Sequence, residues 1–136
     1  MIIPSSSFGV IASSRPRAVA AGPDVTPNPV NWSDDVNYYT ASTNTQTISG
    51  IGTTINLSIS HYTNAQAGAG YAPTYSKNGA NFVAFNTNPF TISVSDGDTL
   101  RFAQETNLYI DRTFTVRNAS DGDAVLDTFT LVASTD

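Results

Sequence analysis

The sequence lacks cysteine, has one tryptophan, one methionine and one histidine, and is poor in charge. Without cysteine there is no disulfide framework, no thiolate metal site and no thiol nucleophile. Charged residues make up 12% of the 136-residue chain, which is about half the usual share. No apolar run approaches the roughly 20 residues of a membrane-spanning helix. We therefore expect neither a membrane partner nor a disulfide-stapled fold.

The few charges are mostly acidic. Six Lys and Arg residues stand against eleven Asp and Glu residues, and the formal net charge is -5. Because binding to a nucleic-acid backbone needs clustered cations, we expect no nucleic-acid partner. Thr, Ser and Asn take the place of charged residues. A neutral surface of this kind suits β structure and dense contacts with other subunits.

The clearest pattern lies in residues 90–102, FTISVSDGDTLRF. Apolar residues alternate with polar ones on both sides of the Asp96-Gly97 step. Successive side chains of a strand point to opposite faces, so one face of each half is apolar. Asp-Gly between two such runs is a strong hairpin signal. The segment predicts two antiparallel strands joined in a hairpin, with one face in a core.

The same alternation recurs along most of the chain, and no stretch has the period of an amphipathic helix. Residues 63–70 are predicted to be a flexible loop and 104–107 a polar connection. The pattern of short strands and turns predicts an all-β fold, a single antiparallel β-sandwich (Ig-like or jelly-roll-like) over residues 30–136. Residues 30–39 are expected to open the folded domain. The other predicted features are strands at 47–51, 53–61, 71–76, 81–85, 109–116 and 125–133, a bulge or sharp bend at Gly50 and Gly52, a hairpin turn at Asn78-Gly79, and a turn at 118–123.

Residues 1–29 are predicted to form an extended N-terminal arm. Its five prolines forbid a long helix or a central strand. The small residues between them cannot bury enough apolar surface to offset their ordering entropy, and the stretch lacks the pattern of an export signal. We expect a partner surface to hold the arm, with folding back on its own domain as the alternative. The expected partner-binding anchors are Ile2, Ile3, Phe8, Val10 and Ile11.

The sequence offers no catalytic constellation. His61 has the same parity as the apolar residues before it, and we expect an edge or core histidine. Glu105 is the only glutamate and lies in a polar connection. No GxSxG motif accompanies the many serines. We predict that the protein is not an enzyme and has no catalytic residue and no cofactor.

Two Asp-Gly-Asp turns carry carboxylates that are candidate Ca²⁺ ligands. The pattern lacks the further spaced carboxylates of a dedicated calcium loop, and Asp-Gly is common where strands connect. We favour the turn interpretation and predict no metal site. The four carboxylates belong to Asp96, Asp98, Asp121 and Asp123.

The aromatic residues have a packing interpretation and a binding interpretation. Trp32 is expected to cap the core. The tyrosines either line a carbohydrate platform or supply packing and interface area, and we favour the second because tyrosine is enriched at protein contacts. The candidates are Tyr38, Tyr39, Tyr62, Tyr71 and Tyr75.

From Trp32 onward, the order of segments resembles a known group of modules. The segments are NWSD, TISGI with TINLSIS, YSKNGANF, FTISVSDGDTLRF and RTFTVRNASDGDAVLDTFTLVAST. The chain resembles the small Ig-like or jelly-roll-like β-sandwich modules of tailed-bacteriophage virion proteins, found in head decoration (cement), tail and fibre components. Similar modules occur in bacterial surface proteins. The resemblance covers roughly residues 30–134 and includes no catalytic motif.

The resemblance implies a structural protein on the outer surface of a phage particle, foremost a capsid decoration or cement protein. Its arm and one sandwich edge would contact the major capsid protein or neighbouring virion subunits and stabilise the assembled head. Symmetric clustering is expected, with a homotrimer as the first hypothesis. Two alternatives stay open: a tail or receptor-binding fibre component, and a bacterial surface carbohydrate-binding or adhesin module.

Overall fold

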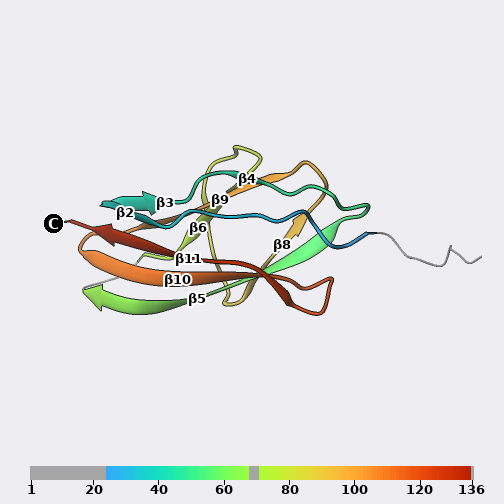
Figure 1. Cartoon of the computed structure of the whole chain (residues 1–136). Coiled ribbons are helices and arrows are strands. Elements are labelled where there is room, and N and C mark those ends of the chain that lie inside the picture. The colour runs from blue at the N-terminus through green and yellow to red at the C-terminus, as the bar shows by residue number, and fades with distance from the viewer. Residues whose placement is uncertain (1–23, 68–70, 136) are drawn as a thin grey trace, which may run out of the picture.

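Two β-sheets face each other as the layers of a sandwich in the computed structural model, which describes residues 24–67 and 71–135 (Figure 1). These residues form strands and turns without a helix, so none of them belongs to a helix long and apolar enough to cross a membrane. The prediction of an all-β sandwich is confirmed.

The first sheet has the strand order β2-β11-β10-β5-β8. Its neighbours pair antiparallel, except that β2 runs parallel to β11. In Figure 1 the long strands β5, β10 and β11 lie together in the lower layer. The strands of this sheet are β2 (Asp35–Tyr38), β5 (Ile55–Ala67), β8 (Phe90–Val94), β10 (Tyr109–Asn118) and β11 (Ala124–Ser134).

The second sheet has the order β3-β9-β6-β7, and β4 pairs with β9 beside β3. The predicted Asn-Gly turn joins β6 to β7: Asn78 and Gly79 have φ angles of 56° and 75°, and the Ala80 N–H donates to the Lys77 carbonyl at 3.1 Å. Positive φ at both positions is what such a hairpin turn needs. The strands are β3 (Thr40–Ser42), β4 (Gln46–Thr47), β6 (Thr74–Lys77), β7 (Val83–Ala84) and β9 (Thr99–Glu105).

The central segment forms two strands, but the predicted hairpin is wrong. β8 pairs with β5 in the first sheet, whereas β9 pairs with β3, β4 and β6 in the second. The Asp96-Gly97 turn therefore crosses between the sheets, with Gly97 at a φ of 93° and the Asp96 carboxylate accepting the Gly50 N–H at 2.7 Å. Alternation determines which face of a strand is buried, but it does not determine which other strand pairs with it.

Two predicted connections are strand. Residues 63–67, predicted to be a loop, extend β5. They are strand because β10 pairs with β5 from Leu57 to Ala67, where Ala67 lies opposite Tyr109. Residues 104 and 105 end β9 and pair with β3. Conversely, only the first residue of the predicted strand 47–51 lies in a strand, at the end of β4. Pairing with a neighbouring strand outweighs local composition in each case.

The core is built on aromatic rings from three strands. Phe114 of β10 and Phe129 of β11 stack with centroids 5.0 Å apart, and Phe102 of β9 reaches across from the second sheet to lie 5.3 Å from Phe129. The Trp32 ring lies 5.3 Å from Phe102, and its indole N–H donates to the Leu100 carbonyl at 3.0 Å. Trp32 is therefore a core residue, as predicted.

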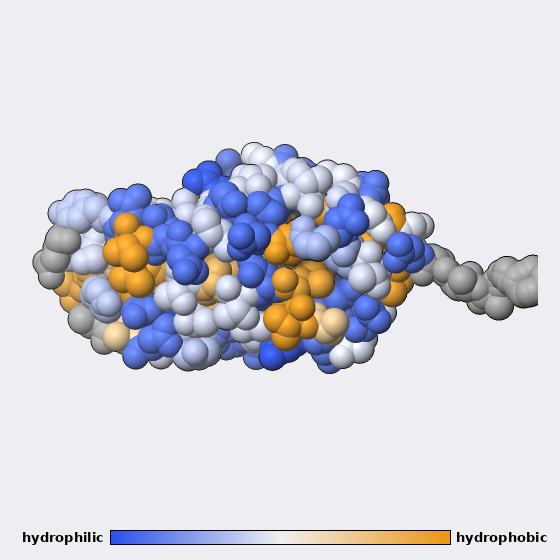
Figure 2. Space-filling model, in the orientation of Figure 1, coloured by the Kyte–Doolittle hydropathy of each residue, from blue (hydrophilic) through white to orange (hydrophobic). Residues whose placement is uncertain are grey.

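The outward face of the first sheet carries hydroxyl and amide side chains. The Thr113 and Thr130 hydroxyls are hydrogen-bonded at 3.0 Å, and the Asn64 amide donates to both Asp111 and Thr113 at 2.8 Å. On the face in Figure 2, apolar side chains form small patches separated by polar ones. This surface has the neutral, polar character that the composition predicts.

The described end of the predicted arm lies along the sandwich. The Asn28 N–H donates to the Ser49 carbonyl, and the Gly52 N–H donates to the Asp24 carbonyl, both at 2.8 Å. These bonds join residues 24–28 to the bend that precedes β5. The predicted anchors Ile2, Ile3, Phe8, Val10 and Ile11 lie outside the described residues.

Candidate functional site

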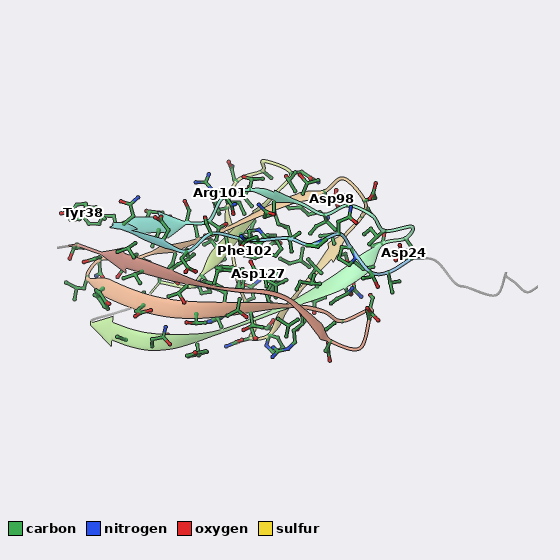
Figure 3. All side chains as sticks on the ribbon, in the orientation of Figure 1. Asp24, Tyr38, Asp98, Arg101, Phe102 and Asp127 are labelled. Atoms are coloured by element: carbon green, nitrogen blue, oxygen red, sulfur yellow. The ribbon has the colours of Figure 1, made fainter. Side chains whose placement is uncertain are left out.

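Exposed apolar side chains gather at one end of the sandwich, which we call the tyrosine end and define as Tyr38, Tyr39 and Leu108. The Tyr38 and Tyr39 rings meet edge to face with centroids 4.3 Å apart, at the corner between β2 and β3. The Tyr39 N–H donates to the Ser134 carbonyl, and the next residue, Thr135, donates to the Leu108 carbonyl. Figure 3 places Tyr38 at the opposite end of the molecule from Asp24.

Tyr39 has an unusual backbone conformation. Its φ of 62° lies in the left-handed region, which a bulky residue rarely adopts. Two hydrogen bonds hold it there: its N–H donates to Ser134 at 2.6 Å, and its carbonyl accepts from Thr106 at 3.1 Å. A strained backbone at a residue whose side chain is exposed is a reason to look for a function.

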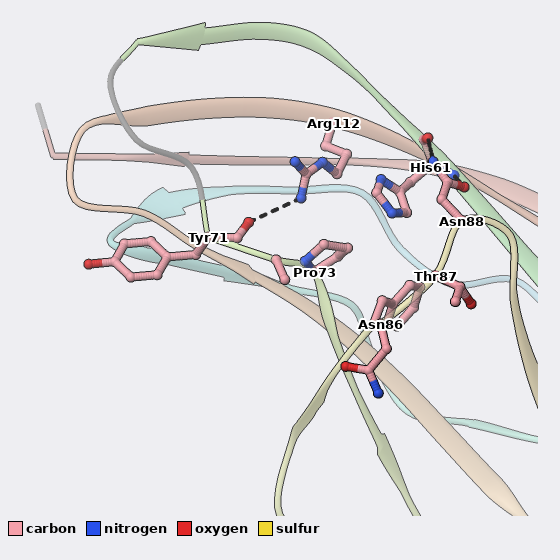
Figure 4. A pocket seen from close by; sticks show the side chains of 9 residues that line it. His61, Tyr71, Pro73, Asn86, Thr87, Asn88 and Arg112 are labelled. Carbon is pink, nitrogen blue, oxygen red and sulfur yellow. Dashed lines mark hydrogen bonds between the residues drawn. The ribbon is translucent and has the colours of Figure 1, made fainter.

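The other predicted tyrosines are dispersed, so no single platform forms. Tyr62 is exposed on β5, and Tyr75 packs against the core rings of Phe85 and Phe90. The Tyr71 ring points away from the pocket described next, whereas its carbonyl faces it (Figure 4). Of these three tyrosines, Tyr75 is the one that supplies packing area in the core.

A polar pocket of about 370 Å³ opens beside the β5–β10 pair (Figure 4). His61 of β5 and Arg112 of β10 line one wall, and residues 85–88 line the other. Its volume lies within the range of about 300–1,000 Å³ that is typical of small-molecule sites. The pocket thus combines a cation, an imidazole and a polar rim in a space large enough for a ligand.

Arg112 lines this pocket although it is only 7% exposed. Strand alternation carries it inward, since it lies two residues before the core residue Phe114. Its guanidinium donates to neutral acceptors: the Gln104 side-chain oxygen, the Tyr71 carbonyl at 3.2 Å and the Thr63 hydroxyl at 3.2 Å. Burial lowers the pKa of Arg112 from its ordinary value, because desolvation disfavours the charged form.

Among the residues that the structure describes, no carboxylate pairs with Arg112. The ion pair found in those ranges joins Lys77 and Asp98 at 3.6 Å. The segments 1–23 and 68–70 contain no Asp or Glu in their sequence. A buried cation without a counter-ion costs free energy, which hydrogen bonds to neutral groups offset only in part.

His61 lies half-buried at the margin of the core, consistent with the expected edge or core histidine. Its ring is 5.9 Å from Phe85 and 6.0 Å from Phe114. Burial, and secondarily the charge of Arg112, lower the pKa of His61 to about 4. The imidazole is therefore neutral at pH 7 and has one donor and one acceptor nitrogen. The Asn88 side chain bonds to the backbone of His61 in both directions and so closes this edge of the strand.

Three of the four aspartates of the Asp-Gly-Asp turns, Asp96, Asp98 and Asp121, accept hydrogen bonds from the chain itself. Asp98 accepts the Ser95 N–H at 2.8 Å and the Asn78 amide at 3.0 Å, and the Ser95 bond is the main cause that lowers the pKa of Asp98. The Asp121 carboxylate accepts the Thr26 hydroxyl at 3.2 Å. In the described ranges, no three His, Cys, Asp or Glu residues are grouped to hold a metal ion. The hydrogen bonds of the Asp98 carboxylate agree with the turn interpretation of this residue.

Sequence reasoning missed Arg112 and its partner Gln104. Gln104 is fully buried, and its amide donates to the Tyr71 carbonyl at 2.9 Å. A signal was available, because Gln104 follows Phe102 by two residues just as Arg112 precedes Phe114 by two. Both polar residues occupy inward positions of apolar strand patterns.

No family model and no curated protein matches the chain significantly. Two solved structures are similar to it in outline. The N-terminal domain of PorA is 14% identical, with a TM-score of 0.28 over 81% of this chain and 90% of that one. A PapD-like (ASH) domain of human CEP192 is 10% identical, with a TM-score of 0.31 over 98% of both chains. Likeness at this level carries no argument about function, and the fold assignment rests on the strand pairing above.

Proposed function

We propose that this chain is a structural protein of a tailed-bacteriophage particle, foremost a capsid decoration or cement protein on the outer surface of the head. It acts by mass action: a protein that binds the assembled shell but not its dissociated parts stabilises the shell. The sequence resemblance motivates the proposal. The tyrosine end is the structural observation that carries it.

The tyrosine end suits contact with a neighbouring subunit. Tyr38 and Tyr39 present an exposed pair of rings on a strained corner that the fold holds in place. Rigid aromatic side chains of this kind often dominate the binding energy of protein interfaces. The described chain begins at Asp24, at the opposite end (Figure 3). A module with a contact point at each end can bridge two subunits of a shell.

The sandwich edges offer a second mode of contact. Among the residues that the structure describes, β2 and β8 are the outer strands of the first sheet. A neighbour's extended arm can add to such an edge through backbone hydrogen bonds. Exchange of arms between copies would also produce the homo-oligomer that we expect, with a trimer as the first hypothesis.

Copy number is the direct test of the proposal. Quantitative mass spectrometry of intact virions should find the protein near-stoichiometric with the major capsid protein. A dozen or fewer copies would instead favour the tail or fibre alternative. Absence from virions would overturn the proposal in both forms.

The contact surfaces can be tested on purified shells with variants of the full chain. Deleting residues 1–23, which leaves the bonded segment 24–28 in place, should abolish binding while the domain still melts cooperatively. Tyr39→Gly removes a ring of the tyrosine end and should weaken binding more than tenfold. Tyr62→Ser is the control, because Tyr62 is an exposed tyrosine on β5, outside the tyrosine end. If the deletion variant and Tyr39→Gly both still bind the shell, the proposed contacts are wrong.

A further inference from the structure

We propose that the pocket at Arg112 binds a sugar residue that carries a carboxylate, of the uronic-acid class. The inference is independent of the proposed function, because it concerns a small-molecule site and not the tyrosine end or the arm. It rests on three observations made on the described residues: no carboxylate pairs with Arg112, the facing rim is polar, and Arg112 is the one cation that lines the pocket.

The first step is the charge of Arg112. A guanidinium has five N–H donors. Four contacts to neutral acceptors involve Nε, Nη1 twice and Nη2, which leaves one Nη2 N–H without an acceptor among the described residues. Asp136 is the only acidic residue of the sequence outside those ranges. A ligand carboxylate would supply both the missing acceptor and the missing counter-charge, through a charge-assisted hydrogen bond.

The second step is the wall that faces Arg112. Asn86 and Thr87 line the pocket at its exposed rim, and their side chains carry an amide and a hydroxyl group. Neutral His61 adds a donor and an acceptor, and Phe85 and Pro73 add apolar surface. Sugar hydroxyls both donate and accept hydrogen bonds, and the C–H face of a sugar ring packs on apolar groups. A uronic acid therefore matches the neutral polar rim as well as the cation.

The third step concerns the number of negative charges on the ligand, which distinguishes a single sugar acid from a polyanion. Arg112 is the one Arg or Lys among the described residues that lines the pocket. Arg101 bonds to Ser42 and Arg117 bonds to Ser60, and neither lines the pocket. An acidic peptide or a nucleic acid would need several cations nearby, whereas one carboxylate needs one. These observations favour a ligand with one negative charge and several hydroxyl groups.

The experiment titrates the full-length chain by isothermal calorimetry with four probes: sodium glucuronate, glucose, sodium acetate and N-acetylglutamate amide. We expect glucuronate to bind more than tenfold tighter than glucose, which has the same ring without the charge. We also expect glucuronate to bind more tightly than acetate, which has the charge without the ring. Tighter binding of N-acetylglutamate amide would overturn the proposal in favour of a peptide carboxylate. Absence of glucuronate binding at about 10 mM would overturn it altogether.

Variants place the binding at this pocket. Arg112→Met should lower glucuronate affinity more than tenfold, whereas Arg117→Met, on the same strand, should leave it unchanged. Because Arg112→Met alters a buried network, Asn86→Ala provides the second test. Asn86 is exposed, so its loss should leave the melting temperature unchanged while weakening glucuronate severalfold and acetate not at all. Wild-type glucuronate affinity in Asn86→Ala or in folded Arg112→Met overturns the assignment. A gain of affinity on removing Asp136 also overturns it, because that gain would show that Asp136 already supplies the counter-charge of Arg112.

Discussion

The interior of the sandwich has an apolar region and a polar region that adjoin on the same two strands. Phe102 and Phe114 meet other rings in the apolar region. Gln104, two residues after Phe102, and Arg112, two residues before Phe114, meet each other in the polar region. Strand alternation buries whatever residue has the inward parity. The difference shows how one backbone pattern serves both as a stabilising core and as the wall of a pocket.

The two regions stabilise the fold by different means. Apolar burial depends on area and is not directional, so rings of similar size can substitute for one another. The polar region depends on directed hydrogen bonds, and removing one partner leaves the other unsatisfied in a region of low dielectric. We therefore expect the apolar region to dominate stability and the polar region to govern ligand binding.

The largest expected effect is in the apolar region. Phe102 of the second sheet is fully buried and contacts Phe114 and Phe129 of the first sheet as well as Phe85, which follows β7. Phe102→Ala should reduce the free energy of unfolding by about 3–5 kcal/mol, because the cavity cannot close fully. Urea denaturation measures the loss, and Phe102→Leu, which retains most of the volume, should lose clearly less. A loss of under about 1 kcal/mol for the alanine variant would contradict the role of Phe102 as the link between the sheets.

The next effect tests whether the polar region acts as a unit. Gln104→Leu removes one acceptor of the buried Arg112 guanidinium and one of the two donors to the Tyr71 carbonyl. It should cost about 2–3 kcal/mol, because a buried charged group loses a hydrogen-bond partner. In the double variant with Arg112→Met, the total loss should be smaller than the sum of the single losses. Strictly additive losses in urea denaturation would show that the two residues are not coupled.

A smaller effect concerns the pH dependence of stability. His61 titrates at about 4 in the folded chain, against 6.5 ordinarily. Between these values the unfolded state binds more protons, so stability falls as the pH falls from 6.5 to 4 and this contribution is constant below 4. Because the ring is only half-buried, solvent screening reduces the loss to about 1 kcal/mol. His61→Gln should flatten the profile of melting temperature in that window, and an unchanged slope would rule out this residue as the cause.

The smallest effect lies outside both regions, at the tyrosine end. Tyr39→Gly relieves the strain of the positive φ and should raise the free energy of unfolding by up to about 1 kcal/mol, offset in part by the greater entropy of the unfolded glycine variant. Tyr39→Ala is the matched control, because alanine is also strained there and should give no gain. Thermal unfolding of the two variants compares them. Equal stability would indicate that the corner is not strained.

The candidate site was only partly predictable from the sequence. His61 was expected at an edge or in the core, and its half-buried place beside Phe85 agrees with that expectation. Gln104 was missed because a polar residue at an inward position looks, along the sequence, like the end of a strand, and only its pairing with β3 shows that β9 continues. Arg112 lies within the predicted strand 109–116, but the sequence does not show that Gln104 lies beside it, because that contact joins two strands.

The sequence by itself determined the all-β class, the buried face of most strands, the place of Trp32 in the core and the Asn78-Gly79 hairpin turn. These features depend on alternation and on the backbone preferences of neighbouring residues. Only the tertiary structure decided which strands pair, so that the Asp96-Gly97 turn crosses between sheets. It alone brought Arg112 to Gln104 and His61, because that contact joins β5, β9 and β10, and no local pattern specifies which strands become neighbours.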